Sequence, residues 1–210
     1  MKKIIILSLF LIFFASAVLA QNQQIQQQAQ SQNMSQVAAE KIKEVKQKIE
    51  QKQQEMEQEI QSMEEISQKV YKNQNQVRTA VHSLLEMKDI IGGIGSEVSQ
   101  IAQEFNNSVQ STIKAEERIE KRNRIVRFFA GGDEEAAELI EQEVNRNRER
   151  IEQLNQLREQ CDCEGEIEAM LQEQIQNMEQ EQERLQQLAQ GEKQHKWLLG
   201  RFSNWLKKLF

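Results

Sequence analysis

The sequence predicts an elongated, all-α protein, and three observations carry this prediction. The 210-residue chain contains no proline, and only 38% of its residues are hydrophobic and 5% aromatic, so a wide globular core is not expected. Gln, Glu, Lys, Arg, Leu and Met, which are good helix formers, dominate the composition. Apolar residues also recur at heptad spacing from residue 42 to residue 126. We expect a long coiled-coil helix with a break allowed at Gly92–Gly95, then an αα-hairpin and a C-terminal amphipathic helix.

Residues 1–20 have the pattern of a secretory signal peptide. Lys2 and Lys3 form a basic start, an apolar run follows, and Val18-Leu19-Ala20 suits a signal peptidase. An uncleaved anchor is the alternative, although a run of about 17 apolar residues is at the short limit for a membrane span. Both alternatives place the remaining chain outside the cytoplasm. Residues 21–36 are Gln-rich and are expected to form a flexible segment or a frayed helix start.

Residues 37–130 are expected to form the coiled-coil helix, through which the protein would associate with itself. Twelve of thirteen residues at the a positions are apolar: Ile42, Ile49, Met56, Met63, Val70, Val77, Leu84, Ile91, Val98, Phe105, Thr112, Ile119 and Val126. The d positions, three residues further on, are less uniform. Polar or charged residues occupy five of them: Lys52, Glu59, Asn73, Ser108 and Arg122. Such residues weaken a seam and can also fix its register.

Gly92, Gly93 and Gly95 interrupt this helix and are the candidate hinge. Three glycines in one turn destabilise a helix by about 3 kcal/mol relative to alanine. Either a hinge within one helix or the turn of an antiparallel hairpin fits this segment. Ile91, Ile94 and Val98 keep the heptad spacing across it, which favours the continuous helix.

Residues 131–192 are expected to form an acidic helical hairpin with its turn at 161–165. They hold 18 acidic and 5 basic side chains, a net charge of −13. The turn contains Cys161 and Cys163, which should oxidise in an exported protein. A local bridge and a bridge between two protomers are both open. Two cysteines are too few for a structural zinc site, which needs four ligands.

Residues 193–210 are expected to form a basic amphipathic tail helix with a net charge of +5. Its candidate membrane-interface residues are Trp197, Leu198, Phe202, Trp205, Leu206, Lys207, Lys208, Leu209 and Phe210. A short basic helix rich in Trp, Phe and Leu is typical of interfacial membrane binding. The alternative is that the tail packs on the acidic hairpin or docks on a protein.

No pattern in the chain predicts catalysis, a bound cofactor or a metal site. We find no nucleophile–base arrangement, phosphate-binding loop or dinucleotide fingerprint. The net charge of −6 argues against nucleic acid as a partner. Asn33 and Asn106 begin Asn-x-Ser triplets that match the glycosylation pattern.

The sequence also resembles a group of small exported coiled-coil proteins of methanogenic archaea that are uncharacterised. The resemblance rests on the run from Arg127 to Asp133, on Ala136-Ala137, on the Cys161/Cys163 turn and on residues 173–193. It implies an archaeal cell-surface setting and no activity. Such proteins tend to end in a Gly-Phe-Gly-Trp-like tail, from which this chain departs at residues 199–202.

We therefore expect a non-enzymatic, exported coiled-coil scaffold of the cell envelope that associates with itself and with a membrane surface. The alternative is an accessory or adaptor subunit of a membrane signalling or transport complex, with the glycine segment as a moving element and an envelope protein as its partner. A third hypothesis is an intramolecular helical bundle that binds a protein partner as a monomer.

Overall fold

The computed structural model describes the backbone of residues 36–122, 126–127, 131–163 and 165–209, and side chains as far as residue 194. These residues are helical apart from short turns, and none of them forms a strand, which confirms the all-α class. The chain divides into two units, Met1–Glu44 and Val45–Phe210. Every contact described below lies within the second unit.

The expectation of one continuous helix over residues 37–130 is wrong. Residues 36–61 are helical, and Ser62 then caps the end with its hydroxyl, which donates to the Glu59 carbonyl at 2.7 Å. Glu64 takes an extended conformation with φ −63° and ψ 155°. The helices that follow are α2 (Glu65–Asn73), α3 (Asn75–Glu86), the short 3-10 helices η1 (Met87–Asp89) and η2 (Gly92–Ile94), and α4 (Gly95–Lys121).

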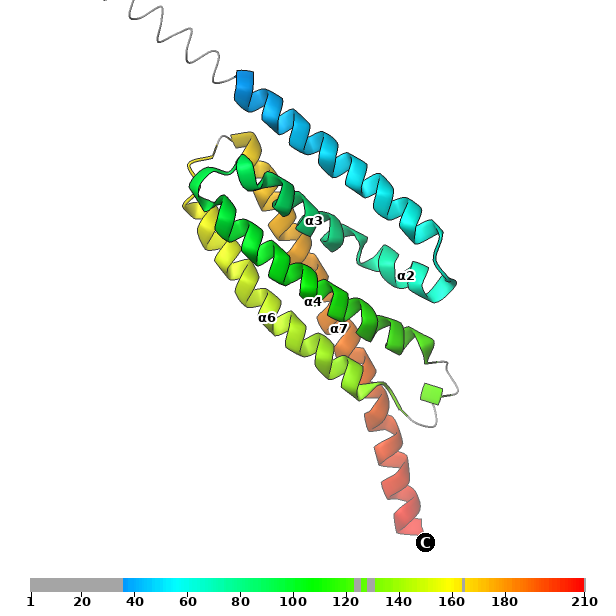
Figure 1. The fold of residues 1–210 in the computed structure, drawn as a ribbon. Helices are drawn as coiled ribbons and strands as arrows, with labels where there is room; N and C mark the ends of the chain where they lie inside the picture. Colours follow the sequence, from blue (N-terminus) through cyan, green and yellow to red (C-terminus); the bar gives the residue numbers. More distant parts are fainter. Residues whose placement is uncertain (1–35, 123–125, 128–130, 164, 210) are drawn as a thin grey trace, which may run out of the picture. The chain divides into compact units, whose positions relative to one another are not determined.

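The glycine segment is a hairpin turn between α3 and α4, not a hinge within a helix. Gly92 has φ +65°, a left-handed conformation that other residues adopt at a cost. A Cβ atom at Gly95 would lie 2.0 Å from the Lys88 carbonyl oxygen, so the two backbones approach too closely for any other residue. The chain therefore reverses here, and α3 packs against α4 (Figure 1).

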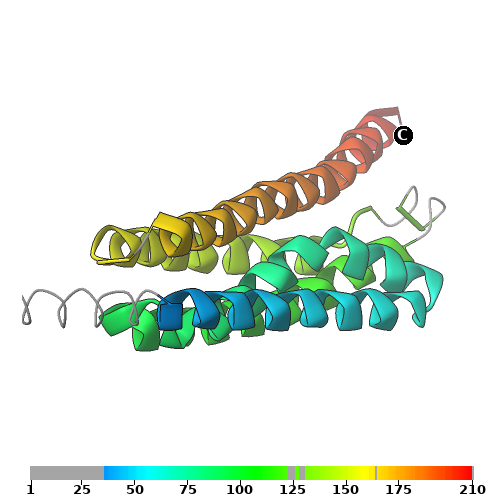
Figure 2. The same cartoon turned by 90° about the horizontal axis from the view of Figure 1, so that it is seen from above.

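The remaining helices are α6 (Glu134–Glu159) and α7 (Gly165–Leu209). Asp133 begins α6 as its N-cap, because its carboxylate accepts a hydrogen bond from the Ala136 N–H at 3.1 Å. Figures 1 and 2 show α6 and α7 side by side, and residues 160–163 follow the end of α6 as a turn. Side-chain pairs that run in opposite sequence directions show that the two helices are antiparallel: Asn155–Glu179, Asn147–Gln182 and Glu141–Lys193.

Together α2–α3, α4, α6 and α7 form a bundle in which consecutive helices run in opposite directions. The helix segment 45–61 lies along α3, where Arg78 pairs with Glu59 at 2.6 Å. Most heptad a positions of the second unit are buried inside the chain itself: Met56, Val70, Val77, Leu84, Ile91, Val98, Phe105, Thr112 and Ile119. The periodicity thus marks the faces of several short helices that share one core.

Candidate functional site

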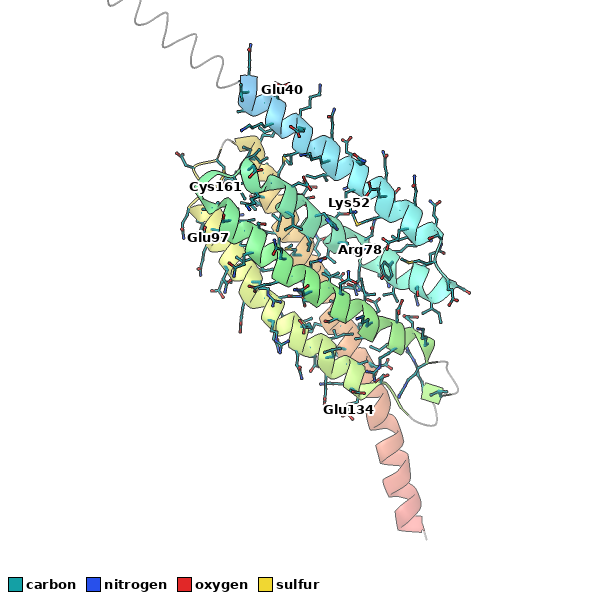
Figure 3. All side chains as sticks on the ribbon, in the orientation of Figure 1. Glu40, Lys52, Arg78, Glu97, Glu134 and Cys161 are labelled. Atoms are coloured by element: carbon teal, nitrogen blue, oxygen red, sulfur yellow. A yellow bond between two sulfur atoms is a disulfide. The ribbon has the colours of Figure 1, made fainter. Side chains whose placement is uncertain are left out.

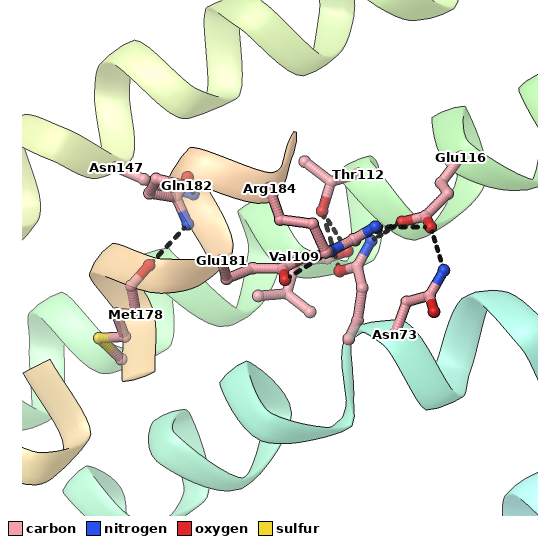
Figure 4. A network of polar contacts seen from close by, with 10 residues as sticks. Asn73, Val109, Thr112, Glu116, Asn147, Met178, Glu181, Gln182 and Arg184 are labelled. Carbon is pink, nitrogen blue, oxygen red and sulfur yellow. Dashed lines mark hydrogen bonds and ion pairs between the residues drawn. The ribbon is translucent and has the colours of Figure 1, made fainter. Parts of the chain in front are cut away.

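A layer of buried polar side chains crosses the middle of the bundle and is centred on Glu116 of α4 (Figure 4). Glu116 is only 1% exposed. Arg184 of α7 donates two parallel hydrogen bonds to its carboxylate, Nη1 to Oε1 at 2.9 Å and Nη2 to Oε2 at 2.6 Å. This bidentate geometry is the strongest form of a guanidinium–carboxylate contact. The pair joins two helices that are distant in sequence.

Amide side chains from the junction of α2 and α3 complete the layer. Asn73, an exposed residue at the edge of the layer, donates to Glu116 Oε1 at 2.8 Å, and the buried Gln74 donates to Oε2 at 3.0 Å. Thr112 donates to the amide oxygen of Gln74 at 3.2 Å. Gln74 is fully buried and lies where α2 gives way to α3. The kink at this residue therefore positions a polar side chain in the core, with both ends of its amide hydrogen-bonded.

Glu181 is the second carboxylate of the layer. Burial raises the pKa of Glu181, while its hydrogen bond to Arg184 acts in the opposite direction and the nearby Glu116 charge raises it further. Burial lowers the pKa of Arg184, but its hydrogen bonds to Glu181 and Glu116 outweigh this, so the pKa is raised overall. One guanidinium thus serves two buried carboxylates.

Two smaller polar contacts extend the layer toward α6. Ser108 donates to Glu143 at 2.7 Å, and both are buried. Asn147 donates to Gln182 at 3.2 Å, and Gln182 in turn donates to the Met178 carbonyl at 3.3 Å. Buried polar networks whose members satisfy one another favour one arrangement of helices over shifted ones. The chemistry of this layer is therefore suited to fixing helix register.

A second polar cluster, the Glu192 clamp, consists of Arg127, Gly132, Asp133 and Glu192. Glu192 accepts from the Asp133 N–H at 2.9 Å and pairs with Arg127 at 3.5 Å. A Cβ atom at Gly132 would lie 2.1 Å from the Glu192 carbonyl oxygen, so this backbone is pressed against α7. The clamp holds the start of α6 on α7 immediately before the tail.

A groove of about 410 Å³ lies between residues 48–55 and α3. Lysine, glutamate and glutamine side chains line it together with His82. Burial lowers the pKa of His82, and the charges of Lys52 and Arg78 lower it further. Among the residues described, no three or more His, Cys, Asp or Glu side chains are placed to hold a metal ion.

Besides the glycines of the turn between α3 and α4, the predicted site residues with described side chains are the two cysteines and Asn106. Cys161 and Cys163 form a disulfide within the chain, which is the local one of the two alternatives. Asn106 is half-buried in α4, and Ser108 of its triplet is buried. Asn33 and Phe210 lie outside the described residues, as do the side chains of the other tail residues.

Sequence reasoning did not identify Glu116, Arg184 or Glu192 as partners. The signal that could have found the layer was the polar residues at heptad core positions, since Asn73, Ser108 and Thr112 all take part in it or in its extension. Lys52, Glu59 and Arg122 were polar core positions of the same kind but are not members of it. Glu116 itself lies next to the heptad core positions, where the sequence gives no reason to single it out from the many other glutamates.

No helix within the described part of the chain is long and apolar enough to cross a membrane. Comparison with protein-family models, with curated proteins and with solved structures found no match to the chain. The similarity to proteins of methanogenic archaea therefore stays a prediction.

Proposed function

We propose that the protein is a non-enzymatic, exported scaffold of the cell envelope that attaches to a membrane surface through the C-terminal part of α7. The observation that carries the proposal is the continuity of α7 from Gly165 to Leu209. One helix contributes to the bundle core and then continues into the basic, Trp-containing tail. The tail is thus presented on a folded support.

The register of α7 supports attachment to a surface over packing of the tail on the hairpin. An α-helix turns about 100° per residue. The positions of α7 that face the core include Leu171, Met178, Leu185 and Ala189. The apolar positions of the tail are Leu198, Phe202, Trp205, Leu206 and Leu209. Counted along one helix, the centre of the tail set is rotated by about 140° from the centre of the core set. Most of this apolar face therefore points away from the core stripe, whereas Leu199 and Leu206 continue it.

The charge and length of the tail support an interfacial role. Residues 193–210 carry five basic side chains and no acidic one. Basic residues near an anionic lipid surface contribute about 1 kcal/mol each. The tail is too short to span a bilayer but long enough to lie in the interface with its apolar side inserted. The proposed partner is therefore an anionic membrane surface.

The heptad residues at the a positions from Val70 to Ile119 are buried in the chain's own core, so this seam has no free side for a second chain. Self-association stays a prediction and would need another surface. Size-exclusion chromatography with light scattering distinguishes a monomer from a dimer.

Vesicle flotation of the mature chain tests membrane attachment. We expect the full chain to float with vesicles that contain anionic lipid, and a chain ending at Gln194 to remain at the bottom. Replacing Leu206 and Leu209 by serine should abolish flotation, whereas the matched change Ser203→Ala on the polar side should not. Equal flotation of the full and shortened chains, or none of either, overturns the proposal.

Export is tested separately. N-terminal sequencing should place the mature start at Gln21 or show a retained anchor, and protease added to intact cells should degrade the chain. A chain that is protected from protease until the cells are lysed contradicts export.

A further inference from the structure

The disulfide between Cys161 and Cys163 closes the turn between α6 and α7. The Cα atoms of the two cysteines are 5.1 Å apart, and both side chains are half-buried. The turn lies at the end of the bundle where α3 and α4 are also joined (Figure 3). Sγ of Cys161 is 3.8 Å from the carbonyl oxygen of Ile91 in that neighbouring turn. The disulfide therefore contacts the turn between α3 and α4 as well as the turn between α6 and α7 in which it lies.

This disulfide contributes little to holding the fold. A disulfide stabilises a protein mainly by restricting the unfolded chain, and the effect grows with the number of residues in the closed loop. Here a single residue, Asp162, separates the two cysteines. The helices on either side are held by their own packing and hydrogen bonds. Breaking the bond therefore leaves the bundle intact, which is a requirement for a disulfide that reacts reversibly.

The two sulfur atoms lie at helix ends of opposite polarity. Cys163 precedes Gly165, the first residue of the 45-residue α7, and the positive end of a helix dipole stabilises a thiolate. Cys161 follows α6, and its N–H donates to the Arg158 carbonyl at 3.1 Å, so it lies at a negative end. The exposed Asp162 lies between the two cysteines and acts on both. Glu166 in the first turn of α7 opposes a thiolate at Cys163. Arg158 in the last turn of α6 favours one at Cys161, so these side chains act against the two helix ends.

The Ile91 carbonyl acts in the same direction as the helix ends in the reduced state. A disulfide sulfur carries no hydrogen, but a protonated Cys161 thiol can donate a weak hydrogen bond to that oxygen. The same carbonyl disfavours a negative charge on Cys161. We therefore expect Cys163 to be the more reactive thiol of the reduced pair.

We propose that Cys161 and Cys163 form a thiol–disulfide exchange site whose partner is a dithiol. One thiolate of the partner attacks Sγ of Cys161, the Cys161–Cys163 bond breaks, and Cys163 leaves with the electron pair as a thiolate. The partner's second thiolate then attacks the partner's first sulfur, which is bonded to Cys161 in the mixed disulfide. A disulfide forms within the partner, and Cys161 is released and takes a proton from water. The balance is a two-electron reduction of the pair and oxidation of the partner dithiol to a disulfide. The reverse reaction begins with attack by Cys163.

The first test measures which thiol reacts. The folded chain is reduced with a phosphine, exposed briefly to limiting iodoacetamide at pH 7, and fragmented in a mass spectrometer to locate the label. We expect Cys163 to be labelled at least about threefold faster than Cys161, in line with thiolate stabilisation at a helix N-terminus. Equal labelling, or faster labelling of Cys161, overturns the proposal. This test uses the unmodified chain, so it does not depend on whether a variant folds.

The second test measures exchange. The oxidised chain is incubated with mixtures of reduced and oxidised dithiothreitol, quenched with acid, and its free thiols are counted. We expect the reduced fraction to follow the dithiol ratio and to return to zero when oxidised dithiothreitol is in excess. A pair that stays oxidised in the folded chain but is reduced in urea contradicts the proposal, as does a pair that does not re-form its bond. The Cys161→Ser variant, checked by circular dichroism, should keep the fast-reacting thiol, whereas Cys163→Ser should lose it.

Discussion

Arg184 of α7 and Glu116 of α4 are 68 residues apart in sequence, and the guanidinium of one meets the carboxylate of the other in the bundle core through two hydrogen bonds of 2.9 and 2.6 Å. The carboxylate is 1% exposed, whereas the Arg184 side chain is 31% exposed. The arginine thus reaches from the bundle surface to neutralise a charge that water does not reach. Mutation of Arg184 and mutation of Glu116 should therefore have different effects on stability.

Arg184→Met should be strongly destabilising, because it leaves the charges of Glu116 and Glu181 buried without their shared cation. Removing one partner of a buried pair typically costs 3–5 kcal/mol, about the size we expect here. Urea unfolding followed by circular dichroism measures it. The double variant Glu116→Gln/Arg184→Met should recover part of the loss, since the oxygen of the introduced amide still accepts from Asn73 or Gln74. The rest of the loss belongs to Glu181, which also loses Arg184. A double variant that is no more stable than the single one would contradict the uncompensated charge as the cause.

Glu181 should make the protein more stable at mildly acidic than at neutral pH. Its pKa is raised in the folded state, chiefly by burial, so folding favours the protonated form. The destabilisation is absent below the unfolded-state pKa and develops as pH rises through the folded-state pKa. Glu181→Gln should therefore increase the free energy of unfolding at pH 7 and change it little near pH 4. Urea titrations of both proteins across this range measure the difference, and a difference independent of pH would refute the prediction.

Gly95→Ala should destabilise the turn between α3 and α4, because the new Cβ atom would collide with the Lys88 carbonyl oxygen. We expect a loss of about 1–3 kcal/mol, as for other overpacked sites, measured by thermal unfolding. Gly93→Ala is the matched control, since no atom lies within 4 Å of its Cβ position and its φ is not positive. If both variants lose equal stability, the close backbone approach at Gly95 is not the reason.

Glu192→Ala should loosen the start of α6. It removes the acceptor for the Asp133 N–H and the partner of Arg127, and an unsatisfied buried donor costs about 1–3 kcal/mol. Hydrogen exchange at the Asp133 amide should become faster by the corresponding factor. Glu183→Ala changes an exposed residue of the same helix and should leave that exchange rate unchanged.

The helical class and many of the buried positions could be read from the sequence, because apolar spacing records which face of a helix is covered. It does not record what covers that face. The row from Met56 to Ile119 is compatible with a second chain and with helices of the same chain, and heptad spacing through Ile91, Ile94 and Val98 favoured the wrong alternative. The deciding features are local: the left-handed backbone of Gly92 and the contact of Gly95 with Lys88.

The break at residues 62–64 had no comparable signal, since neither glycine nor proline occurs there. The polar layer was partly foreseeable from Asn73, Ser108 and Thr112, which occupy core positions of the heptads. Their partners were not foreseeable, because Glu116 and Arg184 are two among many charged residues. Their pairing depends on the order in which four helices come together, which periodicity does not determine.

The continuity of α7 has a mechanical consequence. At 1.5 Å per residue, its 45 residues form a shaft about 68 Å long, clamped near its middle by Glu192. A twist applied to the free end must turn the segment inside the bundle by the same angle, or else break the helix or the clamp. If the tail lies in a membrane surface, the rotation of the tail about the helix axis therefore fixes how the whole bundle is oriented above that membrane.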